Sequence, residues 1–193
     1  MANICCTDIK IIVGEEGVEK LVNFLNETVA KNNGSSVSVI DKLGLNRDDF
    51  CLRSGVESWD FDPDTVYLYN EDAWSPHLGW VYAMCDSVLG EDNYTLLYKA
   101  EEPGDVLYYT NDDFYEDCVY IDFFNVPAEI ERFADMDCFM NVEVVKADME
   151  ELLGHTGTFE ELADEIIELV ETENENGYIA FNVYEFVDGK DLN

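Results

Sequence analysis

Residues 65–100 read TVYLYNEDAWSPHLGWVYAMCDSVLGEDNYTLLYKA. The β-branched and aromatic residues of 65–73 predict a strand. Pro76 is suited to the first turn of a helix, and apolar residues recur at helical spacing over 78–89. Residues 94–100 predict a second strand. A strand, a helix and a further strand in this order form half of a split βαβ arrangement.

The residues before this segment predict the other half of the arrangement. Residues 4–13 alternate apolar and polar side chains and predict a strand, and 15–31 predict an amphipathic helix. After an irregular stretch over 35–53, residues 55–60 predict a strand that forms a hairpin with 65–73. We therefore expect an α+β protein with a ferredoxin-like split βαβ antiparallel sheet and helices on one face.

The remaining residues predict further strands and helices. We divide the chain into a ferredoxin-like domain over 1–125 and an acidic C-terminal α+β extension over 126–193, and leave open that the extension completes the same domain. The additional elements are strands at 105–110, 118–124, 139–145 and 178–187 and helices at 128–134 and 159–171.

Acidic side chains far outnumber basic ones. The chain holds 44 Asp and Glu against 10 Lys and Arg, a formal net charge of −34. A small soluble domain usually has a net charge of magnitude about 2 to 8. Residues 97–193 contain 27 of the acids and 4 of the bases. Such a surface repels nucleic acid and anionic membranes and attracts basic protein grooves, polycations or metal ions. We therefore expect no direct nucleic-acid or membrane partner.

The residues that could support catalysis form no recognisable motif. Six cysteines lack CxxC or Cys/His finger spacing, so reduced thiols packed in the core are expected. The neutral-pH bases are His77 and His155. Cys85 follows His77 by two turns of the same predicted helix, which is too far for contact. We predict no catalytic residue, no cofactor and a non-enzymatic role.

An acidic turn is the candidate metal site. Asp60, Asp62 and Asp64 stand at positions 1, 3 and 5 of an EF-hand loop. However, Thr65 occupies the position that needs glycine, and Pro63 interrupts the loop. We therefore expect a solvated turn, with adventitious binding of divalent ions as the alternative.

The helix predicted over 159–171 is the most suggestive feature of the acidic half. Its outward face repeats carboxylates at spacings of three and four residues, with no lysine between them, although each such like-charge pair costs about 0.2–0.5 kcal/mol. A recognition surface would explain this cost. The candidate partner-binding residues are Glu101, Glu102, Asp112, Asp113, Glu116 and Asp117 in loops and Glu161, Asp164, Glu165 and Glu168 on the helix.

Four short motifs stand in the middle of the chain: Ala73-Trp74-Ser75-Pro76, Leu97-Tyr98, Glu102-Pro103-Gly104 and the YYTND run at 108–112. They resemble the YubB-type ferredoxin-like family, which bacterial plasmids, phages and related mobile elements encode. The resemblance covers 59–124 well and 1–124 loosely. It implies a fold and a genomic setting but no reaction.

Two of these motifs have expected structural roles. Trp74 should pack as an anchor where a strand turns into a helix, and Pro76 should set the first helical turn. Pro103 and Gly104 stand at the second and third positions expected of a type II turn.

Charge and resemblance together predict a non-enzymatic, DNA-mimic-type protein of a mobile element. It would occupy the basic nucleic-acid groove of a host restriction or CRISPR effector, or of another DNA-binding protein, with an affinity that falls as salt rises. The expected location is the cytoplasm of a bacterial host cell. Two alternatives remain: a small metal-dependent enzyme or regulator with its site beside Trp74 and the segment 60–71, and a phage or plasmid scaffold protein.

Overall fold

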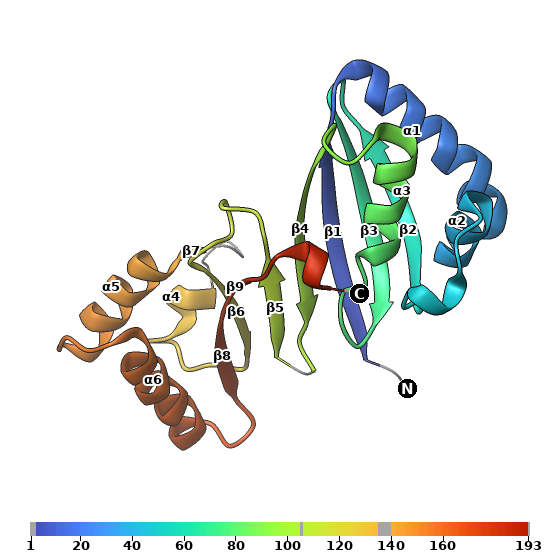
Figure 1. Ribbon diagram of the computed structural model, residues 1–193. Coiled ribbons are helices and arrows are strands. Elements are labelled where there is room, and N and C mark those ends of the chain that lie inside the picture. Colours follow the sequence, from blue (N-terminus) through green and yellow to red (C-terminus); the bar gives the residue numbers. More distant parts are fainter. Residues whose placement is uncertain (1–2, 105, 135–139, 193) are drawn as a thin grey trace. The chain divides into compact units, whose positions relative to one another are not determined.

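The computed structural model describes residues 3–104, 106–134 and 140–192 (Figure 1). They confirm an α+β protein and divide into two compact units. Unit 1 contains Met1–Asp113 and Phe186–Asn193, and unit 2 contains Phe114–Glu185. This division differs from the boundary expected after residue 125, because strand β6 (Cys118–Phe124) pairs with strands that follow it in the chain.

The main sheet has the strand order β2-β3-β1-β4-β5-β9. Strand β1 pairs antiparallel with both β3 and β4, β2 pairs antiparallel with β3, and β4 pairs antiparallel with β5. The predicted hairpin of β2 and β3 is thereby confirmed. The strands are β1 (Ile4–Ile12), β2 (Ser54–Phe61), β3 (Thr65–Ala73), β4 (Thr95–Glu102), β5 (Leu107–Thr110) and β9 (Glu185–Phe186).

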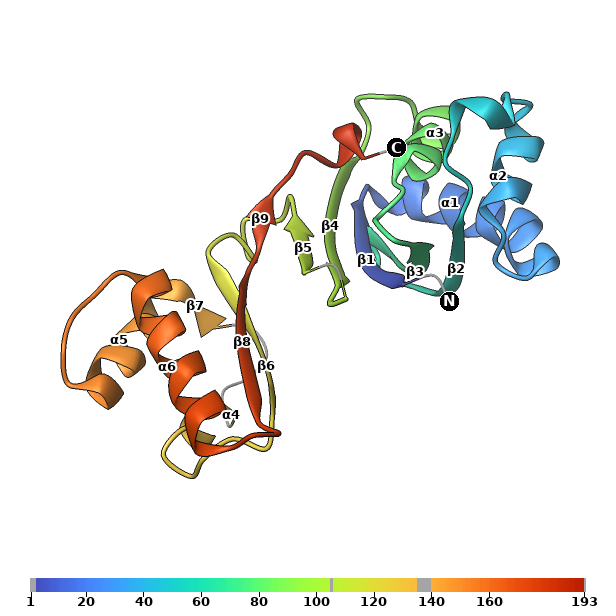
Figure 2. The ribbon, with the colours of Figure 1, turned by 90° about the horizontal axis from the view of Figure 1, so that it is seen from below.

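Three helices cover one face of the unit 1 sheet, as Figures 1 and 2 show. They are α1 (Glu15–Thr28), α2 (Ser36–Leu43) and α3 (Gly79–Leu89). The strands alternate side chains, so every second residue packs under these helices. The hydrophobic core of this layer includes Ile9, Ile11, Leu21, Leu25, Val39, Ile40, Leu68, Trp80, Met84 and Tyr98.

Helix α2 overturns the expectation of an irregular stretch over 35–53. The helix has eight residues, and Val39 and Ile40 supply its buried apolar face. Two turns are too short to establish a periodic pattern in the sequence. Gly44 ends the helix with φ of 68°, the left-handed conformation that commonly closes helices.

Unit 2 contains a sheet of order β7-β6-β8, in which β7 is Met140–Asn141 and β8 is Tyr178–Val183. Both pairings are antiparallel. The helices of this unit are α4 (Glu131–Ala134), α5 (Val142–Leu153) and α6 (Phe159–Glu173). Their core includes Val119, Ile130, Phe133, Val145, Met149, Leu162, Ile166, Val170 and Ile179.

The strand predicted over 139–145 is confirmed only at Met140–Asn141, which form β7, and is wrong from Val142 onward, where helix α5 begins; Phe139 lies outside the described residues. The β-branched run in this segment resembles a strand over a short window. Asn141 starts the helix by accepting a hydrogen bond of 2.9 Å from the backbone N–H of Glu143. Val145 and Met149 then bury one helical face.

The corner before α3 differs from its predicted form. Trp74 has φ of 76°, a conformation that costs about 1–2 kcal/mol for residues other than glycine. Its side chain is 46% exposed, so the prediction that it packs as an anchor is wrong. Pro76 is buried but does not set the first helical turn, because α3 begins three residues later at Gly79. The backbone N–H of Leu78, just before α3, donates to the carbonyl of Leu192 at 3.0 Å.

The connection between β4 and β5 is not the predicted type II turn. Gly104 lacks the positive φ that this turn requires at its third position. The backbone N–H of Gly104 instead donates to the Glu102 carboxylate at 3.1 Å, and that of Val106 donates to the Pro103 carbonyl at 3.3 Å. A Cβ on Gly104 would lie 2.8 Å from the Asn3 side-chain nitrogen and 2.9 Å from the Glu102 carboxylate, so these two side chains would have to shift. Asp105, the first residue of the predicted strand, lies outside the described residues.

Among the described residues, no helix is both long enough and apolar enough to cross a membrane.

Candidate acidic interaction site

The negative charge is denser in unit 2 than in unit 1. Over the 72 residues of unit 2, 20 acidic and 2 basic side chains give −18, whereas the 121 residues of unit 1 hold 24 acids and 8 bases and give −16. Arg132, one of the two bases of unit 2, is already bound by Asp148 at 2.6 Å and Glu151 at 3.4 Å. Most carboxylates of this unit therefore face no cation of their own.

Helix α6 positions a row of these carboxylates. Thr158 starts the helix with a capping box, in which its hydroxyl accepts from the backbone N–H of Glu161 and its own backbone N–H donates to the Glu161 carboxylate. Leu162, Ile166 and Val170 are buried against the unit 2 core. The outward side forms what we call the acidic ridge: Glu160, Glu161, Asp164, Glu165, Glu168 and Glu171.

The ridge carboxylates are largely unneutralised. Glu165 accepts a 2.9 Å hydrogen bond from His155, and this contact raises the pKa of His155 above its ordinary value. Glu161 is engaged in the capping box. In the part of the chain that the structure describes, no hydrogen bond or ion pair involves the side chains of Asp164 or Glu168. The ridge thus retains most of its charge for an external cation.

A hollow of about 310 Å³ lies beside the ridge. Leu169, which is 37% exposed, offers it an apolar surface, and Glu165 and Glu168 offer it carboxylates. A lysine or arginine side chain combines an apolar stem with a cationic head, so this lining matches a basic side chain of a partner. The complete lining is Leu153, Glu165, Glu168, Leu169, Thr172 and Glu173.

Four helix residues of this site, Glu161, Asp164, Glu165 and Glu168, are predictable from the sequence, and all four are exposed on α6. The hollow was not predicted. Leu169 was the available signal, because it stands outside the buried stripe of the helix and yet is apolar.

Two of the predicted loop contacts must be corrected. Glu102 is 3% exposed and its carboxylate accepts from the backbone of Gly104, and Asp112 is 8% exposed and pairs with Lys10 at 3.4 Å. Neither can present its carboxylate to a protein partner. Glu101 is partly buried and already pairs with Lys99 at 2.9 Å.

The other predicted loop acids are exposed but belong to different units. Asp113 lies in unit 1, and Glu116 and Asp117 lie in the loop of unit 2 that precedes β6. Asp117 has φ of 60°, and its carbonyl accepts the backbone N–H of Val142 at 2.8 Å. The candidate partner contacts within unit 2 are therefore Glu116 and Asp117 in this loop and the residues of the acidic ridge.

The acids predicted as weak metal ligands each accept a separate local hydrogen bond. Asp60 accepts from the backbone N–H of Phe61 at 2.8 Å, Asp62 from the Tyr67 hydroxyl at 3.0 Å, and Asp64 from the Thr65 hydroxyl at 3.0 Å. Within residues 3–104, 106–134 and 140–192, no group of three His, Cys, Asp or Glu side chains converges as metal ligands.

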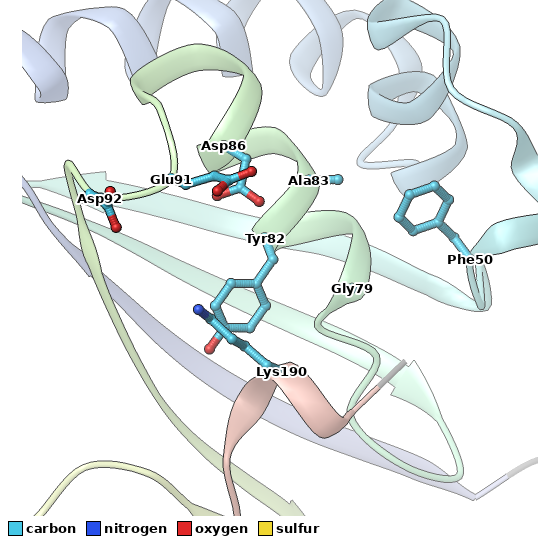
Figure 3. Close-up of a pocket in the computed structure, with 8 residues that line it drawn as sticks. All are labelled: Phe50, Gly79, Tyr82, Ala83, Asp86, Glu91, Asp92 and Lys190. Carbon is cyan, nitrogen blue, oxygen red and sulfur yellow. The ribbon is translucent and has the colours of Figure 1, made fainter.

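Unit 1 contains a separate pocket of about 440 Å³ that the sequence analysis did not predict (Figure 3). Lys190 lies in it with its ammonium 6.0 Å from the centre of the Tyr82 ring, a cation–π contact. Burial raises the pKa of Tyr82 to about 12. The lining residues are Phe50, Gly79, Tyr82, Ala83, Asp86, Glu91, Asp92 and Lys190.

The carboxylates of this pocket share it with a cation that the chain itself supplies. Figure 3 shows Asp86 and Glu91 close together and Lys190 beside Tyr82. The Tyr94 hydroxyl donates to Asp86 at 2.7 Å, and burial together with this carboxylate raises the Tyr94 pKa. Because the pocket already contains Lys190, and Asp86 already accepts the Tyr94 hydroxyl, we place the interaction site on the acidic ridge.

Comparison with known proteins gave no relative from which a function could be transferred: no family model matches the chain, and no curated protein matches it.

Proposed function

We propose that this chain is a non-enzymatic acidic interaction protein. In this proposal, the acidic ridge enters the basic groove of a nucleic-acid-binding protein and imitates the charge of DNA. The observation that carries the proposal is the row of largely unneutralised carboxylates on α6, within a unit of charge −18. Each of these like-charge neighbours costs folding energy, and binding to a cationic groove would offset that cost.

The spacing of the ridge supports the proposal. An α-helix rises about 1.5 Å per residue, so the six carboxylates between Glu160 and Glu171 are spaced at about one per 3 Å of axis. One strand of duplex DNA carries a charge about every 3.4 Å. Lysine and arginine side chains arranged for phosphates could therefore pair with successive carboxylates of the ridge.

The order of the unit 1 strands supports a further part of the proposal, a ferredoxin-like split βαβ fold. In that fold, a helix follows the first and third strands, and the sheet order is 2-3-1-4 with antiparallel neighbours. Strands β2-β3-β1-β4 have this order, with α1 after β1 and α3 after β3. Membership of the YubB-type family, a mobile-element origin and the cytoplasm of a bacterial host are proposed on the resemblance of the sequence.

A competition experiment tests the proposed function. Purified restriction endonucleases and CRISPR effector complexes would be bound to a short fluorescent duplex, and the chain would be titrated in while anisotropy is recorded. We expect the chain to displace the duplex at about 50 mM salt and to lose affinity strongly towards about 200 mM. A salt-independent affinity, or no displacement from any of these proteins, would contradict the proposal.

Matched variants locate the contact. The ridge variant Asp164→Asn/Glu168→Gln/Glu171→Gln should weaken displacement about tenfold or more, since each lost charge contact contributes on the order of 0.5–1 kcal/mol. The control variant Glu15→Gln/Glu19→Gln/Glu57→Gln removes the same charge from exposed positions of unit 1. Equal weakening by both variants would show that net charge alone, and not the ridge, determines binding.

A further inference from the structure

A thiol and an imidazole meet at the corner of unit 1 that precedes α3. The Cys51 sulfur lies 3.3 Å from Nε2 of His77, although 26 residues separate the two in the chain. The same nitrogen lies 3.2 Å from the carbonyl oxygen of Ala73. Sequence spacing directed attention to Cys85 instead, which is buried in the core.

The carbonyl of Ala73 determines which nitrogen of His77 carries the proton. A carbonyl oxygen can only accept, so Nε2 carries the hydrogen and donates it towards Ala73 and the neighbouring Cys51 sulfur. Burial lowers the pKa of His77, and the positive charge of Arg53 lowers it further, so the ring is neutral near pH 7. Nε2 is then a fixed donor at the Cys51 sulfur.

Burial limits the movement of the His77 side chain. The residue is 8% exposed, and its Nδ1 has no hydrogen-bond partner among the described residues. Its backbone lowers the pKa of Asp72, a carboxyl that accepts the Thr7 hydroxyl at 3.0 Å. A ring fixed at this position can stabilise a negative charge that develops on the Cys51 sulfur.

Cys51 differs from the other cysteines that the structure describes. Cys5, Cys85 and Cys118 are buried, and burial raises the pKa of each thiol. Cys6 is half-buried like Cys51, but its sulfur receives the hydroxyl of Tyr69 at 3.2 Å in place of an imidazole. Cys6 is therefore a natural reference for the effect of His77.

We propose that Cys51 is a modification site at which His77 promotes oxidation by neutral hydroperoxides. The Cys51 thiolate attacks one peroxide oxygen, an S–O bond forms and the O–O bond breaks. The leaving group, hydroxide from hydrogen peroxide or alkoxide from an organic hydroperoxide, takes up a proton from solvent to form water or an alcohol. The sulfur loses two electrons and becomes a sulfenic acid, and the peroxide is reduced. A chain of charge −34 repels anionic oxidants, which favours a neutral oxidant.

Site-resolved alkylation tests the role of His77. The folded chain would be treated with iodoacetamide, a neutral reagent, and the rate at each cysteine measured by peptide mass spectrometry. We expect Cys51 to react faster than Cys6. His77→Gln should slow Cys51 about tenfold, as expected for the loss of one hydrogen bond to a charged group, and leave Cys6 unchanged. The control variant His155→Gln removes an exposed imidazole of unit 2 and should change neither rate.

The same mapping detects a variant that fails to fold, because buried Cys5 and Cys85 would then react. If His77→Gln does not fold, the alkylation rate of Cys51 relative to Cys6 in the unaltered chain tests the proposal instead.

The oxidation step is tested with hydrogen peroxide followed by dimedone, which traps sulfenic acids. Dimedone should label Cys51, and Cys51→Ser should remove that label. Equal alkylation of Cys51 and Cys6, no effect of His77→Gln in a folded variant, or no dimedone label at Cys51 would overturn the proposal.

Discussion

Thr7 on β1 donates a 3.0 Å hydrogen bond to Asp72 on β3, inside the layer between the unit 1 sheet and its helices. Both residues are almost completely buried. The strand register makes them diagonal neighbours, since Thr7 faces Asn70 and Cys5 faces Asp72. Burial raises the pKa of Asp72 to about 7, and the hydrogen bonds from Thr7 and the His77 backbone only partly oppose this effect.

This carboxyl predicts a fall in stability between acidic and neutral pH. The folded state holds the Asp72 proton up to about pH 7, whereas the unfolded chain releases it near the ordinary value of 3.8. Stability from this group is therefore fully present below about pH 4 and is lost as pH rises through 7, by at most about 4 kcal/mol. Asp72→Asn should lose this pH dependence, so the difference in stability between variant and wild type should change between about pH 4 and pH 7, as measured by urea unfolding at several pH values. The exposed control Asp62→Asn should retain it.

Adding a single methyl group at Gly34 should strongly destabilise the folded protein. Its φ is 79°, and a Cβ there would lie 2.3 Å from the carbonyl oxygen of Val56. Gly34→Ala should cost more than about 3 kcal/mol, because backbone atoms must move. Gly44→Ala is the matched control: φ is 68°, but nothing lies within 4 Å of the added atom. This control should cost about 1–2 kcal/mol in thermal or urea unfolding, and equal costs would show that backbone conformation alone matters.

The capping box of α6 predicts a moderate loss of stability. Thr158→Ala removes the hydroxyl that accepts the Glu161 backbone N–H and should cost about 0.5–2 kcal/mol in urea unfolding. Thr158→Ser should restore most of the loss. Thr156→Ala, at an exposed position just before the helix, should have little effect. A loss at Thr156 as large as at Thr158 would contradict the capping role.

Repulsion along the acidic ridge predicts a trade between stability and binding. Glu168→Lys should raise the free energy of unfolding by about 0.5–1 kcal/mol at low salt, because it replaces repulsion of Asp164 and Glu171 by attraction. The gain should shrink towards about 1 M salt, where charges are screened within a few ångströms. The same variant should bind a basic partner more weakly. A gain that is independent of salt would show that repulsion is not its cause.

Elements with long periodic patterns could be predicted from the sequence. The pattern in α1 extends over four turns and that in α6 over a similar length, and both begin where expected, at Glu15 and Phe159. Strand β6 was predicted with its observed bounds. Helix α2 was missed because it is short, and the start of α5 was mistaken for a strand because β-branched residues favour both contexts when they pack well.

Within the candidate sites, the exposure and contacts of a side chain were predictable only where a single helix determines them. The ridge residues were predictable, because one helix carries them and the helical period alone turns them away from its apolar face. Glu102 and Asp112 were not, because strand pairing and a local turn determine their burial. The contact between Cys51 and His77 likewise joins distant parts of the chain.

The amino-acid sequence by itself therefore determined the acidic excess, its concentration towards the C-terminus and the carboxylate row on α6, since these depend on composition and on interactions within one helix. Only the tertiary structure decided which acids are buried, which thiol meets an imidazole and which carboxyl retains its proton to about pH 7. Those properties depend on strand register and desolvation, and both are set by residues that are far apart in the chain.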